Sequence, residues 1–216
     1  MEIKVYNFTG KRIPLIDYFI NEPKAEKNKK RPLIVALHGA GERGNDTEKL
    51  FIHGLPKYIR AGRKISAVVI APQCPAGYVW NQLTEELKEL IDFVCREYDI
   101  DLDRITMTGL SMGGYGTWEM GMSYPGFFAA LAPICGGGIS WRAQLIGKTP
   151  VWAIHGDADT VVPVNNSIEM CDKLKSVGGN VELTLLHGVG HNSWEFAYER
   201  TCLIDWLLSK SKKTES

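Results

Sequence analysis

The stretch Gly109-Leu110-Ser111-Met112-Gly113-Gly114 decides the fold, because it joins two segments of different periodicity. The run from Arg104 to Thr108 before it suits a strand, and Ser111 to Ser123 after it has the spacing of a helix. A strand that turns at once into a helix strains the backbone of the serine, and the flanking glycines leave room for neighbouring elements. The pattern predicts a nucleophile elbow with Ser111 as the nucleophile. The alternative is a glycine-rich turn that carries an exposed serine.

Strand and helix signals alternate on both sides of this turn. Apolar runs of strand length are Pro32 to Leu37, Ala67 to Ala71, Ala129 to Ile134, Val151 to Ile154 and Val181 to Leu186. Helical spacing marks Leu83 to Tyr98, Asn165 to Val177 and Ser193 to Ser209. Continuous apolar runs suit parallel strands that are covered on both faces, so the chain is expected to form a doubly wound α/β sheet. Ile3 to Phe8 and Ile13 to Ile20 predict an antiparallel hairpin at its edge.

Length and composition limit the class of protein. The 216 residues favour one domain over 1–216, with a frayed polar tail at 210–216. The 25 basic and 25 acidic residues balance, which argues against a nucleic-acid partner. The apolar runs are too short for a membrane span, and the N-terminus lacks the pattern of a secretory signal. Five scattered cysteines favour reduced thiols and a cytoplasmic setting over disulfides or a zinc site.

A serine nucleophile needs an orienting acid and a base later in the chain. The stretch His155-Gly156-Asp157-Ala158-Asp159 follows a predicted strand and offers two acids. Asp159 is preferred because it lies farther into the turn, whereas Asp157 could cap that turn.

The base is sought after the last predicted strand. The stretch His187-Gly188-Val189-Gly190-His191 begins where that strand ends and offers two histidines. His191 is preferred, because the Gly-Val-Gly loop can carry it toward the carboxyl edge of the sheet. His187 still belongs to the strand end.

The loop His38-Gly39-Ala40-Gly41-Glu42-Arg43-Gly44 is the candidate for the rest of an oxyanion hole. Small residues let backbone N–H groups point inward without obstruction, and Ala40 is the expected donor together with Met112 at the helix start. A phosphate-binding loop is the rival, but neither phosphate-loop pattern is present. His38 is expected to be structural.

The motifs together resemble a known superfamily. They are the glycine loop at 38–44, the elbow at 109–114, the acid segment at 155–159 and Gly190-His191. The set is similar to α/β-hydrolases, and within them to compact serine esterases of the phospholipase/carboxylesterase and feruloyl-esterase-like group, from about Pro32 to Leu208. The resemblance implies a site formed by Ser111, Asp159, His191 and the N–H groups of Ala40 and Met112. Dienelactone hydrolases are also similar, but they have cysteine at the elbow.

The expected reaction is hydrolysis of a carboxylic ester through an acyl-enzyme, without metal or organic cofactor. Trp80 and Gly41 are expected to contact the substrate. Only Cys135 to Thr149 separates two strands where related folds insert a lid, so the cleft should be open and suit short or compact aromatic acyl groups, including esters on carbohydrate. The alternatives are a serine peptidase of the prolyl-oligopeptidase type and a hydrolase-fold protein that only binds its ligand. The oligomeric state is left open.

Overall fold

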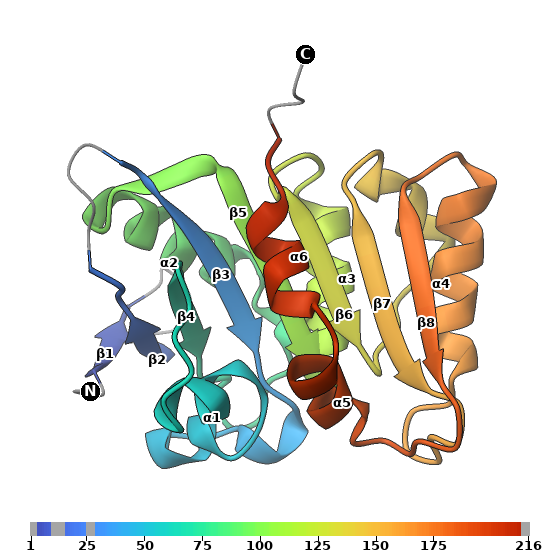
Figure 1. Cartoon of the computed structure of the whole chain (residues 1–216), viewed down its shortest axis with the longest axis horizontal. Helices are drawn as coiled ribbons and strands as arrows, with labels where there is room; N and C mark the ends of the chain where they lie inside the picture. Colours follow the sequence, from blue (N-terminus) through green and yellow to red (C-terminus); the bar gives the residue numbers. More distant parts are fainter. Residues whose placement is uncertain (1–3, 10–15, 25–28, 213–216) are drawn as a thin grey trace.

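A single sheet organises the part of the chain that the computed structural model describes, residues 4–9, 16–24 and 29–212. Its strands lie in the order β1-β2-β4-β3-β5-β6-β7-β8 (Figure 1). Their bounds are β1 Lys4–Phe8, β2 Ile16–Asn21, β3 Arg31–Leu37, β4 Val68–Pro72, β5 Ile100–Leu110, β6 Ala130–Ile134, β7 Val151–Gly156 and β8 Val181–Leu186. The pairs from β4 to β8 are parallel, and β1 and β2 are antiparallel. The predicted α/β sheet with its N-terminal antiparallel hairpin is confirmed.

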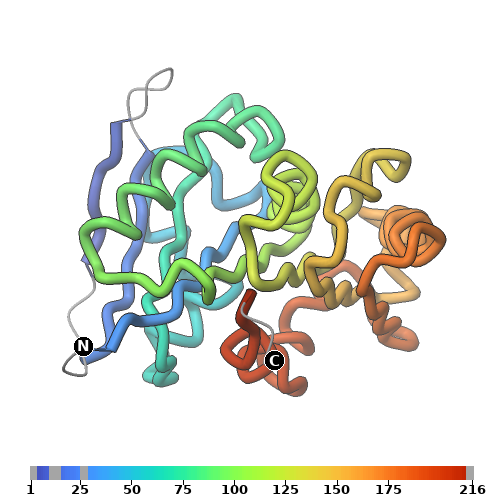
Figure 2. Tube along the Cα trace, turned by 90° about the horizontal axis from the view of Figure 1, so that it is seen from above, coloured from blue at the N-terminus to red at the C-terminus, as the bar shows by residue number. Residues whose placement is uncertain are grey.

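Helices cover both faces of the sheet. They are α1 Gly54–Arg60, α2 Thr84–Glu97, α3 Met112–Ser123, α4 Asn165–Ser176, α5 Ser193–Arg200 and α6 Leu203–Ser209. Helices α2, α3 and α4 lie on one face of the sheet, and α1, α5 and α6 lie on the other (Figure 2). The apolar residues of the first three helices belong to one buried cluster, and those of the other three belong to a second. Four short 3-10 helices, η1 Ala40–Glu42, η2 Thr47–Phe51, η3 Trp80–Gln82 and η4 Ser140–Ile146, lie in the loops among these described residues. Because both faces are covered, β4 and β6 are apolar and buried at every residue.

The largest differences from the sequence-based expectation concern α5 and α6, β5 and α1. The predicted helix at 193–209 is two helices, because Thr201 adopts an extended backbone and its hydroxyl accepts the N–H of Leu203, which starts a new helix. Strand β5 begins at Ile100, four residues earlier than its apolar run, because Ile100 pairs with Arg31 across a register shift. Helix α1 had no clear signal in the sequence.

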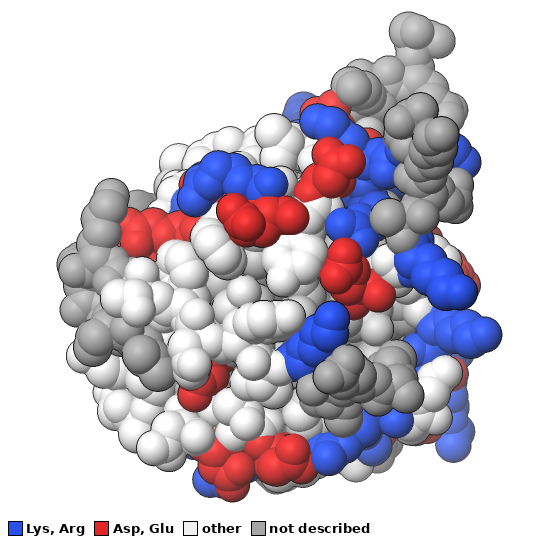
Figure 3. All heavy atoms as spheres, turned by 90° about the vertical axis from the view of Figure 1, so that its left-hand side faces the viewer, with Lys and Arg blue, Asp and Glu red and all other residues white. Residues whose placement is uncertain are grey.

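Parts of the N- and C-terminal predictions lie outside the described residues. These parts are Ile3, residues 10–15 between and at the start of the predicted hairpin strands, and the last four residues of the expected frayed tail. Within the described tail, the Lys212 N–H donates to the Asp103 carbonyl at 2.8 Å, so this residue docks on the start of β5. No helix in the described ranges has the length and apolar character needed to cross a bilayer. On the side of the molecule that contains β1 and β2, charged side chains lie mainly around a broad uncharged area (Figure 3).

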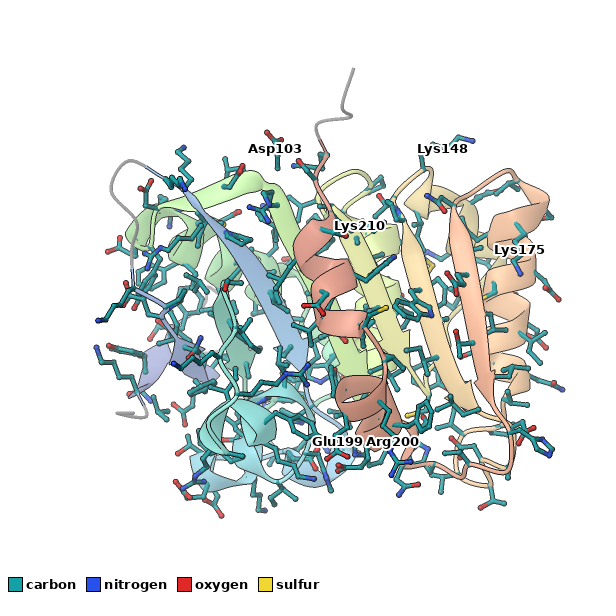
Figure 4. The ribbon with its side chains drawn as sticks, in the orientation of Figure 1. Asp103, Lys148, Lys175, Glu199, Arg200 and Lys210 are labelled. Carbon is teal, nitrogen blue, oxygen red and sulfur yellow. The ribbon has the colours of Figure 1, made fainter. Side chains whose placement is uncertain are left out.

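The parallel strands all end at one edge of the sheet, where the loops with the candidate site residues gather. The opposite edge carries charged side chains that include Asp103 and Lys148 (Figure 4). The candidate site residues therefore gather at the carboxyl edge, where open α/β sheets bind their ligands.

Candidate active site

Ser111 occupies a sharp turn between β5 and α3. Its backbone has φ 53° and ψ −117°, which a residue with a side chain seldom adopts. The Ser111 N–H donates to the Ile134 carbonyl at 2.9 Å, so the turn is fixed to β6. The arrangement has the strand, turn and helix of the predicted elbow.

The glycines on either side of Ser111 are required by close backbone contacts. A β-carbon at Gly109 would lie 2.3 Å from the carbonyl oxygen of Gly113, and one at Gly113 would lie 2.2 Å from the carbonyl oxygen of Leu37. A side chain at either position would push α3 away from β5 or β3. The G-x-S-x-G spacing is therefore a packing requirement of this turn.

His191 and Asp159 continue from Ser111 in a series of hydrogen bonds. His191 Nε2 lies 2.9 Å from Ser111 Oγ, and His191 Nδ1 lies 2.7 Å from Asp159 Oδ2. Asp159 follows β7 and His191 follows β8, so the side chains meet in the order serine, acid, histidine along the chain. In this geometry His191 can take the proton of Ser111, and Asp159 can stabilise the resulting imidazolium.

Asp159 is held as a carboxylate. Burial opposes its ionisation, but hydrogen bonds from His191 and from the N–H groups of Val162 and Val161 outweigh it and keep the pKa of Asp159 below its ordinary value. The two N–H groups reach Oδ1 at 2.9 and 2.8 Å, respectively. Its side chain is fully buried, so His191 faces a fixed negative charge.

The second acid and the second histidine pair with each other instead. His187 Nδ1 lies 2.9 Å from Asp157 Oδ2, and the Gly188 N–H donates to Asp157 Oδ1 at 2.7 Å. The hydrogen bonds from His187 and Gly188 lower the pKa of Asp157. The His187 side chain is 99% exposed. This pair therefore ties two loops together at the surface.

The expected oxyanion donors are the first residues of two helices beside Ser111, one long and one short. Met112 is the first residue of α3, and Ala40 is the first residue of η1. A β-carbon at Gly39 would lie 3.7 Å from Ser111 Cβ, which shows how closely this loop approaches the nucleophile. Arg43 fixes the loop, since its Nε donates to the Ala40 carbonyl at 3.0 Å. Helix starts leave backbone N–H groups free to bind an anion.

His38 orients the peptide that carries the Ala40 N–H. Its Nδ1 lies 2.6 Å from the Gly39 carbonyl oxygen, and its Nε2 accepts the Cys74 N–H at 2.9 Å. In a trans peptide the C=O and N–H groups point in opposite directions. Because the Gly39 carbonyl points to the His38 ring, the N–H of Ala40 in the same peptide points away from that ring. Burial lowers the pKa of His38 to about 4, which keeps the ring neutral. Its structural role agrees with expectation.

We expect acid to weaken the fold through His38. In the unfolded chain His38 takes up a proton near pH 6.5, whereas in the folded protein its pKa is about 4. The stability that depends on a neutral His38 is therefore present above pH 6.5 and is lost as the pH falls below it. The loss at pH 4 is about 3 kcal/mol of unfolding free energy. Urea unfolding of the wild type and His38→Gln at pH 7 and pH 4 should show a smaller drop for the variant. Equal drops in both proteins would contradict the assignment.

The expected contact of Trp80 with substrate does not fit the structure. Trp80 is fully buried, and its Nε1–H donates to the His38 carbonyl at 2.9 Å. It therefore supports the glycine loop from behind. Gly41 is exposed, and a β-carbon added to it would meet no heavy atom of the described residues within 4 Å. Trp194, mostly buried, packs its ring edge-on against His191 at 5.3 Å.

Two further residues near the site, Cys135 and His155, were not predicted from the sequence to belong to it. Cys135, at φ 40°, follows β6 and is buried, which raises the pKa of its thiol to about 12. In the described chain, potential metal-ligating atoms of Cys135, Asp159 and His191 lie within 4.8 Å of one another, but a metal there would have to replace the His191–Asp159 hydrogen bond. The second residue, His155, contacts Asp159 from β7. Its place at a strand end, four residues before Asp159, was the available clue.

Known proteins are similar to this chain in sequence and in fold. Residues 78–200 match the model of the phospholipase/carboxylesterase family. A probable feruloyl esterase C of Aspergillus terreus is 29% identical over 185 residues, which are 81% of this chain and 64% of that protein. A bifunctional acetylxylan esterase/xylanase of Neocallimastix patriciarum is 26% identical over 136 residues, 61% of this chain and 20% of that protein. The chain thus spans less than two thirds of the length of these relatives.

A solved structure has the same architecture over nearly the whole chain. It is described as a thermostable esterase, is 35% identical, and superposes with a TM-score of 0.85 over 97% of this chain and 63% of its own. The sheet order, the serine elbow and the family match agree with one another. The chain has the α/β-hydrolase fold and belongs to the phospholipase/carboxylesterase family.

Proposed function

We propose that the protein is a serine carboxylic-ester hydrolase that acts through an acyl-enzyme. The observation that carries the proposal is the continuous hydrogen-bonded series from Ser111 through His191 to Asp159 at the elbow. A serine hydroxyl is a weak nucleophile, and this series supplies the base and the charge that activate it. The esterase names of the relatives and of the similar structure support the same class of reaction.

The proposed steps follow from the positions of these groups. Ser111 Oγ attacks the ester carbonyl carbon while His191 Nε2 takes the hydroxyl proton. The Ala40 and Met112 N–H groups bind the oxyanion of the tetrahedral intermediate. His191 then protonates the leaving alcohol, and water repeats the sequence on the acyl-enzyme. Asp159 stabilises the imidazolium in both halves.

Covalent trapping tests this proposal directly. An organophosphorus ester should phosphorylate the serine of the elbow and stop turnover of a nitrophenyl acetate substrate. Peptide mass spectrometry should find the added mass on Ser111. Full turnover after complete labelling, or a label on another residue, would show that Ser111 is not the nucleophile.

The proposed substrates are esters with short or compact aromatic acyl groups, including those on carbohydrate. The segment between β6 and β7 contains one short helix, η4, and it packs against α3 and α4. Such a segment leaves the cleft without a helical cap of its own. Two relatives are named as feruloyl and acetylxylan esterases, and the acyl groups in these names are of this size.

We also propose a cytoplasmic location. The five cysteines are free thiols in the structure, and reduced thiols are typical of proteins in that compartment.

We expect kcat/KM to be highest for acetyl to butyryl or compact aromatic esters and to fall by octanoyl. Each buried methylene contributes about 0.8 kcal/mol, and an open cleft stops burying them after a few carbons. Rates with nitrophenyl esters of increasing chain length, measured below the micelle concentration, provide the test. A rise that continues through dodecanoyl, or activation at a lipid interface, would point to a lipase instead.

A further inference from the structure

His155 is a buried histidine that the proposed steps do not use. It lies near the end of β7, is 0% exposed, and contacts three oxygen atoms. Its Nε2 lies 3.2 Å from Asp159 Oδ2 and 3.0 Å from the Val162 carbonyl oxygen, and its Nδ1 lies 2.7 Å from Ser167 Oγ.

These partners determine the tautomer of the ring. A carboxylate and a carbonyl can only accept hydrogen bonds, so Nε2 carries the proton. Burial lowers the pKa of His155, which favours the neutral ring with Nδ1 unprotonated. Ser167 Oγ carries one proton and lies 2.7 Å from Nδ1 and 2.9 Å from the Gly136 carbonyl oxygen, so this proton is shared between the two acceptors. His155 thereby connects the acid loop to α4 and to the segment that follows β6.

Every accepting direction of the Asp159 carboxylate is occupied as a result. Oδ1 accepts two backbone N–H groups, and Oδ2 is shared by the rings of His191 and His155. The bond to His191 is the shorter of the two at Oδ2, 2.7 against 3.2 Å. His155 therefore restricts where Oδ2 lies while leaving the stronger bond to His191.

We propose that His155 is a positioning residue that holds Asp159 Oδ2 in line with His191 by a hydrogen bond from its Nε2. This inference rests on the proposed serine mechanism and adds a fourth side chain to it. A neutral ring suits the task, because it restricts the carboxylate without cancelling the charge that His191 requires. Misplacing a group that orients the base by about 1 Å can cost about 100-fold in rate.

Two substitutions separate positioning from packing. In His155→Gln the side-chain nitrogen takes the place of Nε2 and keeps the bond to Asp159. In His155→Asn the side-chain amide reaches only as far as Nδ1, near Ser167, and leaves Asp159 without this donor. We expect kcat for a short nitrophenyl ester to fall about 10- to 100-fold in His155→Asn and to stay within about threefold in His155→Gln, with KM little changed in either.

Rates should be expressed per active site, counted by titration with the organophosphorus ester, so that misfolded protein does not contribute. Thermal melting reports any loss of stability. His187→Asn makes the same change in an exposed ring that does not contact Asp159, and its kcat should equal that of the wild type. If His155→Asn does not fold, Ser167→Ala removes only the hydroxyl that orients the ring, and its kcat should fall less but in the same direction.

Equal kcat in the wild type, His155→Gln and His155→Asn would overturn the positioning role. Equal losses in the two variants that follow their melting temperatures would overturn it as well, since packing alone would explain them. Both results leave the serine mechanism intact as long as labelling stays at Ser111, so the two proposals can fail separately.

Discussion

A Ser111→Ala protein is expected to fold normally and to lose ester turnover by about 10⁴- to 10⁶-fold. The substitution removes the hydroxyl group alone, and this group is hydrogen-bonded to His191 at a partly exposed site. Removing it therefore deletes the nucleophile at little cost in stability. Steady-state turnover of nitrophenyl acetate, together with thermal melting, measures both effects.

A Ser123→Ala variant is a suitable control for this experiment. Its hydroxyl donates to Glu119 Oε1 at 3.0 Å at the far end of the same helix, so its loss leaves the elbow unchanged. Turnover near the wild-type rate in folded Ser111→Ala would end the serine-esterase proposal.

Substitution of the inner acid and histidine should be nearly as damaging, while the same changes in the outer pair should be tolerated. Asp159→Asn is expected to lower kcat by about 10⁴, because the amide no longer stabilises the imidazolium or selects its tautomer. Asp157→Asn should stay within about threefold, because the hydrogen bonds of its carboxylate to described residues go to His187 and Gly188, and Ser111 and His191 are not among these partners. The same contrast is expected between His191→Gln and His187→Gln.

The four proteins should be compared at equal folded fraction, because Asp157 and His187 join two loops and their loss can cost some stability. The outcome that would contradict the assignment is a reversal, with the outer pair essential and the inner pair dispensable. That result would place the base and acid differently while keeping Ser111 as the nucleophile.

The sequence predicted the elbow well because packing leaves it no alternative. Gly109 and Gly113 contact backbone atoms directly, and such contacts admit only glycine. The strand ends that carry Asp159 and His191 were also readable, since parallel strands end at one edge. Choosing between the two acids and two histidines needed an assumption about how far each loop reaches, and the structure supplies that distance.

The remaining features depend on contacts between distant segments. Trp80 lies in a loop on the catalytic edge, and nothing local indicates that its ring turns inward to the His38 carbonyl. His155 looks like an ordinary strand residue until α4 brings Ser167 against it. The break between α5 and α6 depends on one threonine hydroxyl inside a continuous helical pattern.

The backbone contact at Gly113 has a consequence for engineering this protein. The start of α3 touches the carbonyls of both Leu37 and His38, so the nucleophile and the glycine loop behave as one rigid block. Asp159 and His191 lie in the loops that follow β7 and β8, in a separate half of the sheet. Engineering of the cleft or of thermal stability should therefore leave the glycine loop and the elbow unchanged. The loops after β7 and β8 are the better targets, because they set the position of Asp159 and His191 relative to Ser111.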